Sequence, residues 1–291
     1  MKLGSAWMLV AGASFATMGL LVKQCVPYFS ADELVFYRSL FGLILVGALP
    51  LYQGCTLKTR YWSMHLMRSL CGLASLWLFF FTLARVPLAT AVTLNYTSPL
   101  FFAFLLTVLG REPVARSLLL SLGTGFIGVL LVLQPHVANS EWLSGCTGLL
   151  SGVTAGISYL YVRHLGQVGE PEWRIVFYFS GLSTLVLGAV VLLKPHHPLT
   201  FSHPGLLVSL GAVATLGQWA MARAYRTGTS LLVANFAFST VLFSCILGAV
   251  FLNEKLDAHT WWGILAVILA GIMSTMIIRR HNEAQLHQNR S

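Results

Sequence analysis

The sequence predicts an all-α polytopic membrane protein with ten transmembrane helices, arranged as two inverted five-helix repeats. First, 56% of its residues are hydrophobic and only 9% are charged, which is outside the range of soluble proteins. Second, the apolar runs are about 20 residues long, the length that a helix needs to cross a bilayer. Third, the stretch from Pro87 to Glu112 recurs as a pattern from Thr229 to Glu254, 142 residues later.

Ten apolar runs are bounded by charges, proline or clusters of glycine. The first run begins like a secretory signal, with Lys2 before a short apolar stretch, but it continues to Val22 and has a counterpart in the second half. We therefore expect it to be kept as the first membrane helix. The ten runs cover residues 3–22, 34–52, 64–84, 88–110, 114–133, 143–162, 174–193, 205–225, 229–252 and 260–278.

The distribution of Lys and Arg predicts that both termini are cytoplasmic, because short, positively charged loops stay on that side. In this orientation thirteen Lys and Arg, including Arg68, fall in cytoplasmic segments, four fall outside, and Arg38 remains within a span. The prediction is a multi-pass protein of a bacterial inner membrane, with a basic cytoplasmic tail at residues 279–291. The lipid bilayer is its expected solvent, and the sequence leaves a homodimer open.

The two predicted repeats occupy residues 1–135 and 143–278. Because each has five spans, an odd number, the second must enter the membrane from the opposite side. Inverted repeats are typical of secondary transporters that work by alternating access, with a substrate site near the bilayer midplane. Matching positions include Gly12 with Gly152, Trp77 with Trp219, and Gly128 with Gly271.

Several motifs together resemble one transporter family. The fourth run ends in Gly110-Arg111-Glu112, the ninth ends in Leu252-Asn253-Glu254, and the fifth and tenth runs are rich in glycine. Over residues 5–278 this pattern is similar to the EamA family of the drug/metabolite transporter superfamily. The segments 36–39, 68–69 and 96–99 look like its S-adenosylmethionine-carrier branch. The resemblance implies a central cavity lined by helices 1 to 4 and 6 to 9, helices 5 and 10 at the periphery, and a small metabolite as substrate.

The halves differ at two positions of this pattern. Val241 stands at the counterpart of Pro99, and Phe179 at that of Arg38. We therefore expect the two halves to move differently near Pro99, and an asymmetric site.

Arg38 is the foremost candidate for substrate binding. A charged side chain within a span costs about 2.5 to 3.5 kcal/mol on insertion scales and usually faces a wet cavity or a partner. Its guanidinium would suit a carboxylate or phosphate. The alternative is that its long stem snorkels to the interface.

Further candidates are polar or aromatic residues within the spans. Asn95, Tyr96, Gln218 and Asn235 could orient a zwitterion, although interhelical hydrogen bonding explains such residues equally well. Phe238 belongs to the same group as Asn235, on the ninth run. Trp77 and Trp219 could form aromatic walls for a cationic or heteroaromatic substrate, or they could simply face lipid.

Three charged residues at helix ends are candidate gating residues: Lys23, Glu112 and Glu254. No Asp or Glu lies deep within a predicted span, so the carboxylate that a proton relay commonly uses is missing. Facilitated diffusion or exchange therefore needs fewer assumptions.

The predicted function is secondary transport of a small polar or zwitterionic metabolite, such as an amino acid or an S-adenosylmethionine-like derivative, and not catalysis. The alternatives are a membrane-embedded transferase, for which the dispersed histidines are unfavourable, and a channel, for which no filter-like segment is evident. We expect no cofactor and no metal, because the five cysteines lack C-x-x-C spacing. We expect no nucleic-acid partner, because the Lys and Arg residues are scattered between apolar runs and form no basic stripe.

Overall fold

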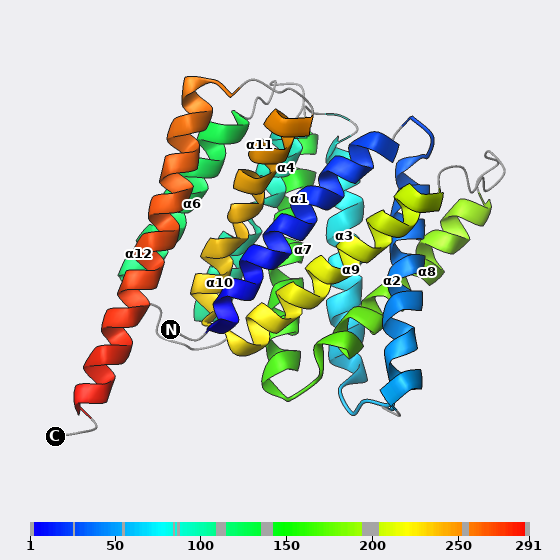
Figure 1. Cartoon of the computed structure of the whole chain (residues 1–291), viewed down its shortest axis with the longest axis horizontal. Coiled ribbons are helices and arrows are strands. Elements are labelled where there is room, and N and C mark those ends of the chain that lie inside the picture. The colour runs from blue at the N-terminus through cyan, green and yellow to red at the C-terminus, as the bar shows by residue number, and fades with distance from the viewer. Residues whose placement is uncertain are drawn as a thin grey trace.

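Every regular element is a helix within the residues that the computed structural model describes, which are 3–25, 27–53, 56–83, 85, 88–108, 115–134, 142–193, 204–251 and 256–288 (Figure 1). The helix α1 begins on the same side of the molecule on which α12 ends. The elements are η1 Leu3–Ala6, α1 Trp7–Cys25, α2 Ala31–Gln53, α3 Trp62–Leu83, α4 Leu88–Asn95, α5 Ser98–Val108, α6 Arg116–Leu133, α7 Trp142–Gln167, α8 Glu172–Leu193, α9 Pro204–Thr227, α10 Ser230–Ala237, α11 Ser239–Phe251 and α12 Ala258–Gln288.

The helices follow the apolar runs of the sequence to within a few residues in most cases. The last run is an exception, because α12 continues past residue 278 to Gln288, so most of the predicted tail is helical. The fourth and ninth runs each form two short helices instead of one. Asp257 precedes α12, where its carboxylate accepts a hydrogen bond from the Thr260 backbone N–H at 2.9 Å and caps the helix.

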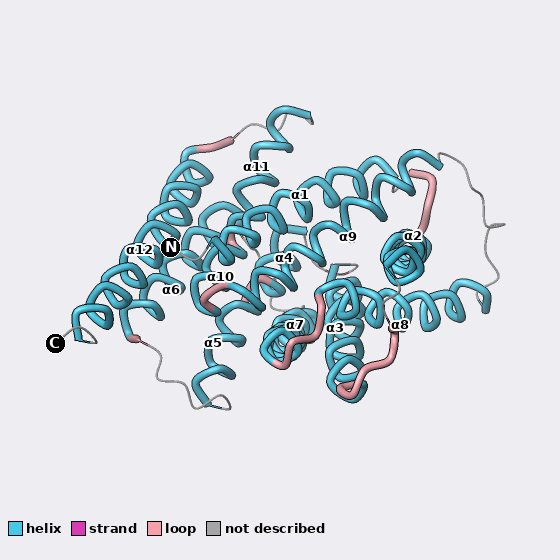
Figure 2. The backbone as a smooth tube through the Cα atoms, turned by 60° about the horizontal axis from the view of Figure 1, so that its bottom comes forward, coloured by secondary structure: helices cyan, strands magenta, loops and turns pink. Residues whose placement is uncertain are grey.

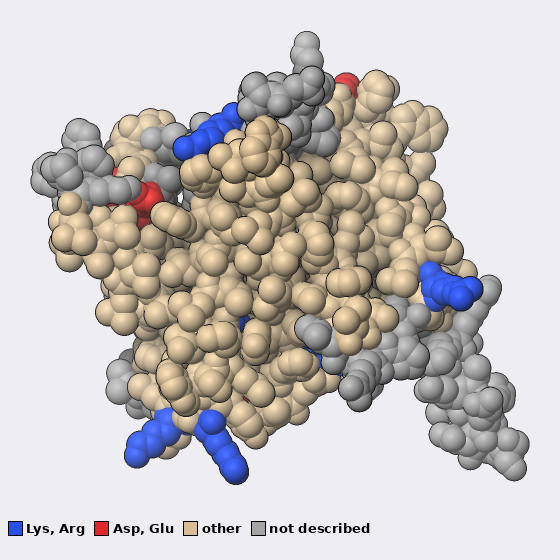
Figure 3. All heavy atoms as spheres, turned by 180° about the vertical axis from the view of Figure 1, so that it is seen from behind, with Lys and Arg blue, Asp and Glu red and all other residues tan. Residues whose placement is uncertain are grey.

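Seven helical stretches of the described chain are long and apolar enough to cross a membrane. Their outward side chains are large and apolar, as in Leu193, which is 83% exposed. Figure 3 shows a broad uncharged band across one face, with the charged side chains mainly at its margins. This pattern suits a lipid environment, and the protein is an integral multi-pass membrane protein. The seven stretches are 4–25, 91–108, 116–133, 172–193, 204–227, 230–251 and 258–277.

The most extensive helix contacts join the first half of the chain to the second. The helix α1 packs on α9 and α11, while α7 packs correspondingly on α3 and α5. The helix α2 lies against α8. The pair α6 and α12 lies side by side at one edge, as the tilted view in Figure 2 also shows. Helices that are far apart in the sequence therefore form one continuous bundle.

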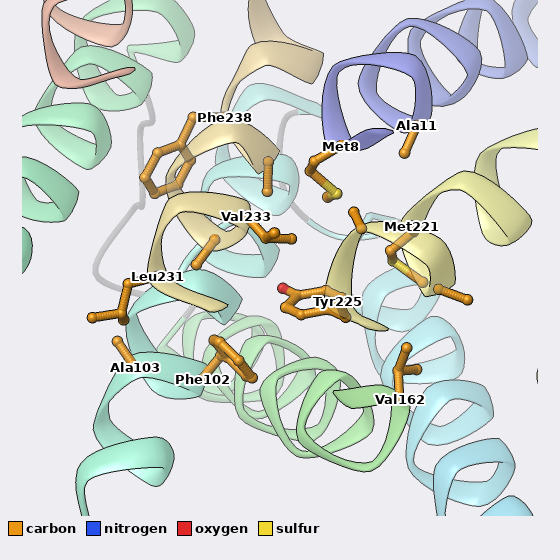
Figure 4. Packing of buried hydrophobic residues seen from close by; sticks show 14 of the residues in the cluster. Met8, Ala11, Phe102, Ala103, Val162, Met221, Tyr225, Leu231, Val233 and Phe238 are labelled. Carbon is orange, nitrogen blue, oxygen red and sulfur yellow. The ribbon is translucent and has the colours of Figure 1, made fainter. Parts of the chain in front are cut away.

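A hydrophobic core fills the middle of this bundle. Its members come from α1 and from each helix from α5 to α12, and many are fully buried. Figure 4 shows Phe102 of α5, Tyr225 of α9 and Val233 of α10 around one part of it. The rings of Phe102 and Tyr225 lie 5.1 Å apart, edge to face. This geometry is the one that aromatic quadrupoles favour.

Both split helices break at matching places. The first break, at Tyr96 and Thr97, precedes Pro99, which has no N–H to donate to the carbonyl of Asn95. The second break is at Phe238, 142 positions after Tyr96, although Val241 replaces the proline there. Proline therefore does not explain the second break.

A glycine of the opposite half packs against each break. A Cβ on Gly152 of α7 would meet the Thr97 hydroxyl and lie 2.9 Å from the Leu94 carbonyl oxygen. A Cβ on Gly12 of α1 would lie 2.7 Å from the Ser239 hydroxyl. Only a glycine allows this close approach, which is the role that small residues play between membrane helices.

Candidate functional site

A cluster of polar side chains lies between α2, α3, α8 and α9, and we call it the guanidinium pocket. Its two cations are Arg38 of α2, which is half-buried, and Arg68 of α3, which is only 2% exposed. Arg68 donates a hydrogen bond from Nη2 to Oε1 of Gln218 at 2.7 Å. The Arg68 guanidinium carbon lies 3.8 Å from the ring centroid of Phe179, so the group stacks on an aromatic face.

The space beside Arg38 is small. Its lining includes Phe179 and Gln218, and its volume is about 10 Å³, which holds no more than one water. The remaining lining residues are Ser39, Val176, Ser180, Ala214 and Thr215. A metabolite therefore does not fit in this conformation, and the helices must separate before one can enter.

The two guanidiniums lack acidic partners among the residues that the structure describes. Arg38 contacts the Met18 sulfur from Nη1 at 3.7 Å, and neither arginine forms an ion pair with any described residue. Nε and Nη1 of Arg68 are buried without a hydrogen-bond partner in this part of the chain. Because buried charges are normally paired, these donors are available to an anionic ligand.

Three tyrosines connect this pocket to the helix breaks. Tyr159 of α7 interacts electrostatically with Arg68 and hydrogen-bonds to Ser98, the first residue of α5. Tyr225 stacks on Tyr159, with ring centroids 5.8 Å apart. Tyr96, which lies in the first break, hydrogen-bonds to Thr240, just after the second break. Movement at either break would therefore change the surroundings of Arg68 through the contacts of these side chains.

Asn95 and Asn235 lie in separate hydrogen-bond networks. Asn95 donates from Nδ2 to the Ser151 hydroxyl at 3.1 Å and ties α4 to α7. Asn235 donates from Nδ2 to Ser121 at 2.8 Å and to Ser274 at 2.5 Å, which joins α10 to α6 and α12. The structure does not bring the two amides together, and both groups hold helices to one another.

The predicted aromatic residues are also dispersed. Trp77 is 70% exposed on the outside of α3, away from the guanidinium pocket. Trp219 packs edge to face on Trp7, with centroids 5.2 Å apart, and Arg223 lies over both rings. Phe238 is fully buried and lies near Phe126. Of the predicted substrate-binding residues, Arg38 and Gln218 meet in the guanidinium pocket, and Tyr96 lies in the neighbouring tyrosine group.

A larger cavity of about 350 Å³ lies between α1, α10, α11 and α12. Its lining is mostly apolar, with Leu242, Val267 and Ile268 among its walls. Asn235 and Ser239 are among its polar lining residues, but none of the described residues in the lining is charged. We therefore place the candidate site at the guanidinium pocket, where charged donors are available.

A second polar cluster surrounds Glu170, in the turn between α7 and α8, on the side of the molecule where the N-terminus lies (Figure 1). Glu170 accepts hydrogen bonds from Thr59 at 2.5 Å and from Arg174 Nη1 at 2.8 Å, and His65 Nε2 lies 3.4 Å away. Burial would raise the pKa of this carboxyl, but the hydrogen bonds from Thr59 and Arg174 and the nearby positive charges outweigh burial and lower it.

Glu172 extends this cluster to the end of α9. Its carboxylate lies 3.0 Å from Arg226 Nη1 and 3.8 Å from Arg223 Nη1. Together Glu170 and Glu172 fasten the α7–α8 turn to the chain before α3 and to α9. We call this network of Thr59, His65, Glu170, Glu172, Arg174, Arg223 and Arg226 the acidic clamp.

The acidic clamp differs from the gate that the sequence suggested. Lys23 is exposed near the end of α1, and Glu112 and Glu254 lie outside the described residues. The sequence pointed to these three because they stand at the ends of the repeated stretches. A short turn carrying two carboxylates, with three arginines near the adjoining helix ends, was the signal that could have identified the clamp.

Arg68 is the main residue that sequence reasoning left out of the site. The predicted topology counts it among the cytoplasmic charges, whereas it lies within α3 and is almost fully buried. Its position four residues inside the predicted run 64–84 was the available signal, because interior charges are usually functional.

Comparison with known proteins identifies the family of this chain. The model of the EamA-like transporter family matches residues 2–134 and again residues 142–276. The chain belongs to this family. This confirms the resemblance found in the sequence.

Relatives of this EamA-family protein are named transporters. A pseudopaline exporter from Pseudomonas aeruginosa is 30% identical over 272 residues, which cover 94% of this chain and 95% of the relative. A riboflavin transporter from Vibrio cholerae is 24% identical, with coverage of 92% and 91%. An S-adenosylmethionine uptake transporter from Rickettsia bellii is 23% identical, with coverage of 92% for both.

A protein of known crystal structure has the same fold. The two superpose with a TM-score of 0.80 at 16% sequence identity, and the match covers 96% of this chain and 97% of the other. This likeness concerns the fold alone.

Proposed function

We propose that this protein is a secondary transporter that moves a small polar or zwitterionic metabolite across the bacterial inner membrane by alternating access, and that it is not an enzyme. The observation that carries the proposal is the guanidinium pocket. Arg38 lines a small space between helices of both halves, and Arg68 contacts Gln218 and Phe179 of the same lining, with donors that no described residue uses. Such a site binds and releases an anionic group without needing catalytic partners.

The proposed architecture is ten membrane spans in two inverted repeats with both termini in the cytoplasm. In support, α1 contacts α9 and α11 as α7 contacts α3 and α5, which is the relation that a twofold axis would produce. The split helices supply further support, because discontinuous helices mark the substrate site in inverted-repeat transporters. The acidic clamp would then close the cytoplasmic side.

The names of the relatives support the general class. They include an exporter and an uptake protein, and their named cargoes are pseudopaline, riboflavin and S-adenosylmethionine. Because these cargoes differ, the proposal for this chain names only a class of substrate. From the guanidinium pocket, this class is a small metabolite with at least one acidic group, held by Arg38 and Arg68 and oriented by Gln218 and Tyr96.

A metabolite comparison tests the proposed function. Bacterial cells would carry wild-type protein, Arg68→Gln or the empty vector, with equal amounts of the two proteins in the membrane, and the metabolites of cytosol and medium would be measured by mass spectrometry. We expect at least one small metabolite to be redistributed by the wild type and not by Arg68→Gln. Trp77→Ala is the matched control, because this side chain is exposed on the outside. Identical profiles for wild type and empty vector would refute transport.

A further inference from the structure

The charge balance of the guanidinium pocket bears on the net charge of the ligand. Arg38 belongs to α2 and Arg68 to α3, two helices that both pack on α8, and Gln218 of α9 lies beside both arginines, lining the space next to Arg38 and accepting from Arg68. Two positive charges this close repel each other, and burial strengthens the repulsion because the surroundings have a low dielectric constant. A ligand that neutralises only one of them leaves the other uncompensated.

The geometry of Arg68 fits an acidic group. Stacking on Phe179 fixes the plane of the guanidinium, and Gln218 accepts one of the two Nη2 hydrogens, so the other can still form a two-bond edge with Nε or Nη1. Nε and Nη1 remain buried, with no partner among the described residues. A guanidinium has five donors in a rigid fork and pairs with carboxylate or phosphate through two parallel bonds, whereas neutral acceptors rarely match it.

Within the described part of the chain, nothing comparable serves a positively charged group of the ligand. The carboxylates whose side chains the structure describes lie in turns or in the first turns of helices, and none of them lines the space beside Arg38. These carboxylates are Asp32, Glu33, Glu170, Glu172 and Asp257. The tyrosine group offers aromatic faces, but Arg68 lies beside Tyr159 and would repel a cation there. The pocket therefore selects against a net positive ligand.

We propose that the transported molecule carries two acidic groups, one for Arg38 and one for Arg68, and is a net anion at neutral pH. This inference rests on the proposed function and narrows its substrate class from polar or zwitterionic to dianionic. An amine elsewhere in the molecule is compatible with it, provided that the acidic groups outnumber the basic ones.

The experiment compares ligands that differ by one acidic group. Purified protein in detergent is titrated with succinate, with butyrate and with inorganic phosphate at constant ionic strength, and the thermal unfolding midpoint is followed, because a ligand that binds the folded form raises this midpoint. We expect succinate to bind at least about tenfold more tightly than butyrate, since an additional charged pair is made in a buried site. Phosphate, which is partly dianionic at neutral pH, should also stabilise.

Two variants identify the groups responsible. Arg38→Gln and Arg68→Gln should each reduce the preference for succinate over butyrate to about twofold or less, because one guanidinium then remains for one carboxylate. Arg163→Gln is the control, since Arg163 is also a buried arginine in a helix but donates to Ser230 at 2.6 Å outside the pocket. It should keep the preference even if its midpoint is lower.

Three results would overturn the inference: equal affinity for butyrate and succinate, a preference that survives in Arg38→Gln, or no stabilisation by any of the three anions. The metabolite comparison separates this failure from failure of the proposed function. If cells still redistribute a metabolite through the wild type and that metabolite is neutral, cationic or monoacidic, transport stands and the dianionic class is wrong.

Discussion

Replacing Arg68 by glutamine should separate ligand binding from stability. The variant loses a hydrogen bond from a charged donor to Gln218, which contributes about 1.5 to 3 kcal/mol, and the contact with Phe179, which contributes about 0.5 to 2 kcal/mol. It also removes a buried charge that costs about 2.5 to 3.5 kcal/mol. These contributions nearly cancel, so we expect the free energy of unfolding to change by less than about 2.5 kcal/mol in either direction.

The effect of the same change on transport should be much larger. Charge-assisted hydrogen bonds to the anionic ligand are lost without compensation, and about 1.5 to 3 kcal/mol corresponds to a rise in KM of roughly 10- to 150-fold. The assay is uptake of the identified metabolite into proteoliposomes, with the thermal midpoint measured on the same preparation. A KM within about threefold of wild type, or a collapse of the midpoint with binding intact, would show that Arg68 is a structural residue and would refute the reasoning.

Three further changes test other parts of the structure. Gly152→Ala should destabilise the protein by about 1 to 3 kcal/mol through overpacking against Thr97, whereas Gly145→Ala, whose Cβ would have no atom within 4 Å, should not; equal thermal midpoints would show that α7 can move away from the break. Glu170→Gln should lower the midpoint at neutral pH, and its difference from wild type should shrink as the pH falls below the unfolded-state pKa of about 4.3, because a carboxyl whose folded pKa is lowered stabilises only while ionised; a difference independent of pH would contradict this. Trp77→Ala should leave KM unchanged in the uptake assay, and an increase would place this exposed side chain at the site.

The positions of most helices were predictable because the apolar periodicity and length of a membrane helix are set locally, by the bilayer. The runs 143–162 and 205–225 correspond closely to α7 and α9 for this reason. The two helix breaks were harder to predict from the sequence. Pro99 gives a local cause for the first, but the second, at Phe238, has no proline and lies against Gly12 from another helix, a contact that no local pattern reveals.

The site was only partly predictable, since its composition depends on which faces of the helices meet. Arg38 stood out as a charge within a span, and Gln218 as a polar residue beside a tryptophan. Asn95 and Asn235 had the same local signature, yet they satisfy serines on adjacent helices instead. Trp77 matches Trp219 in the sequence, but one is exposed and the other packs on Trp7. Matching positions in a repeat predict equal depth, and they do not predict equal surroundings.

The way the two halves pack has a consequence for biosynthesis. The most extensive contacts of α1, α2, α3 and α6 are with helices made later, namely α9, α8, α7 and α12. The first half therefore enters the membrane with its largest contact surfaces facing lipid and must wait for the second half before it can assemble. Once assembled, the halves are held by their helices, so the chain that links them is needed to bring them together and not to keep them together.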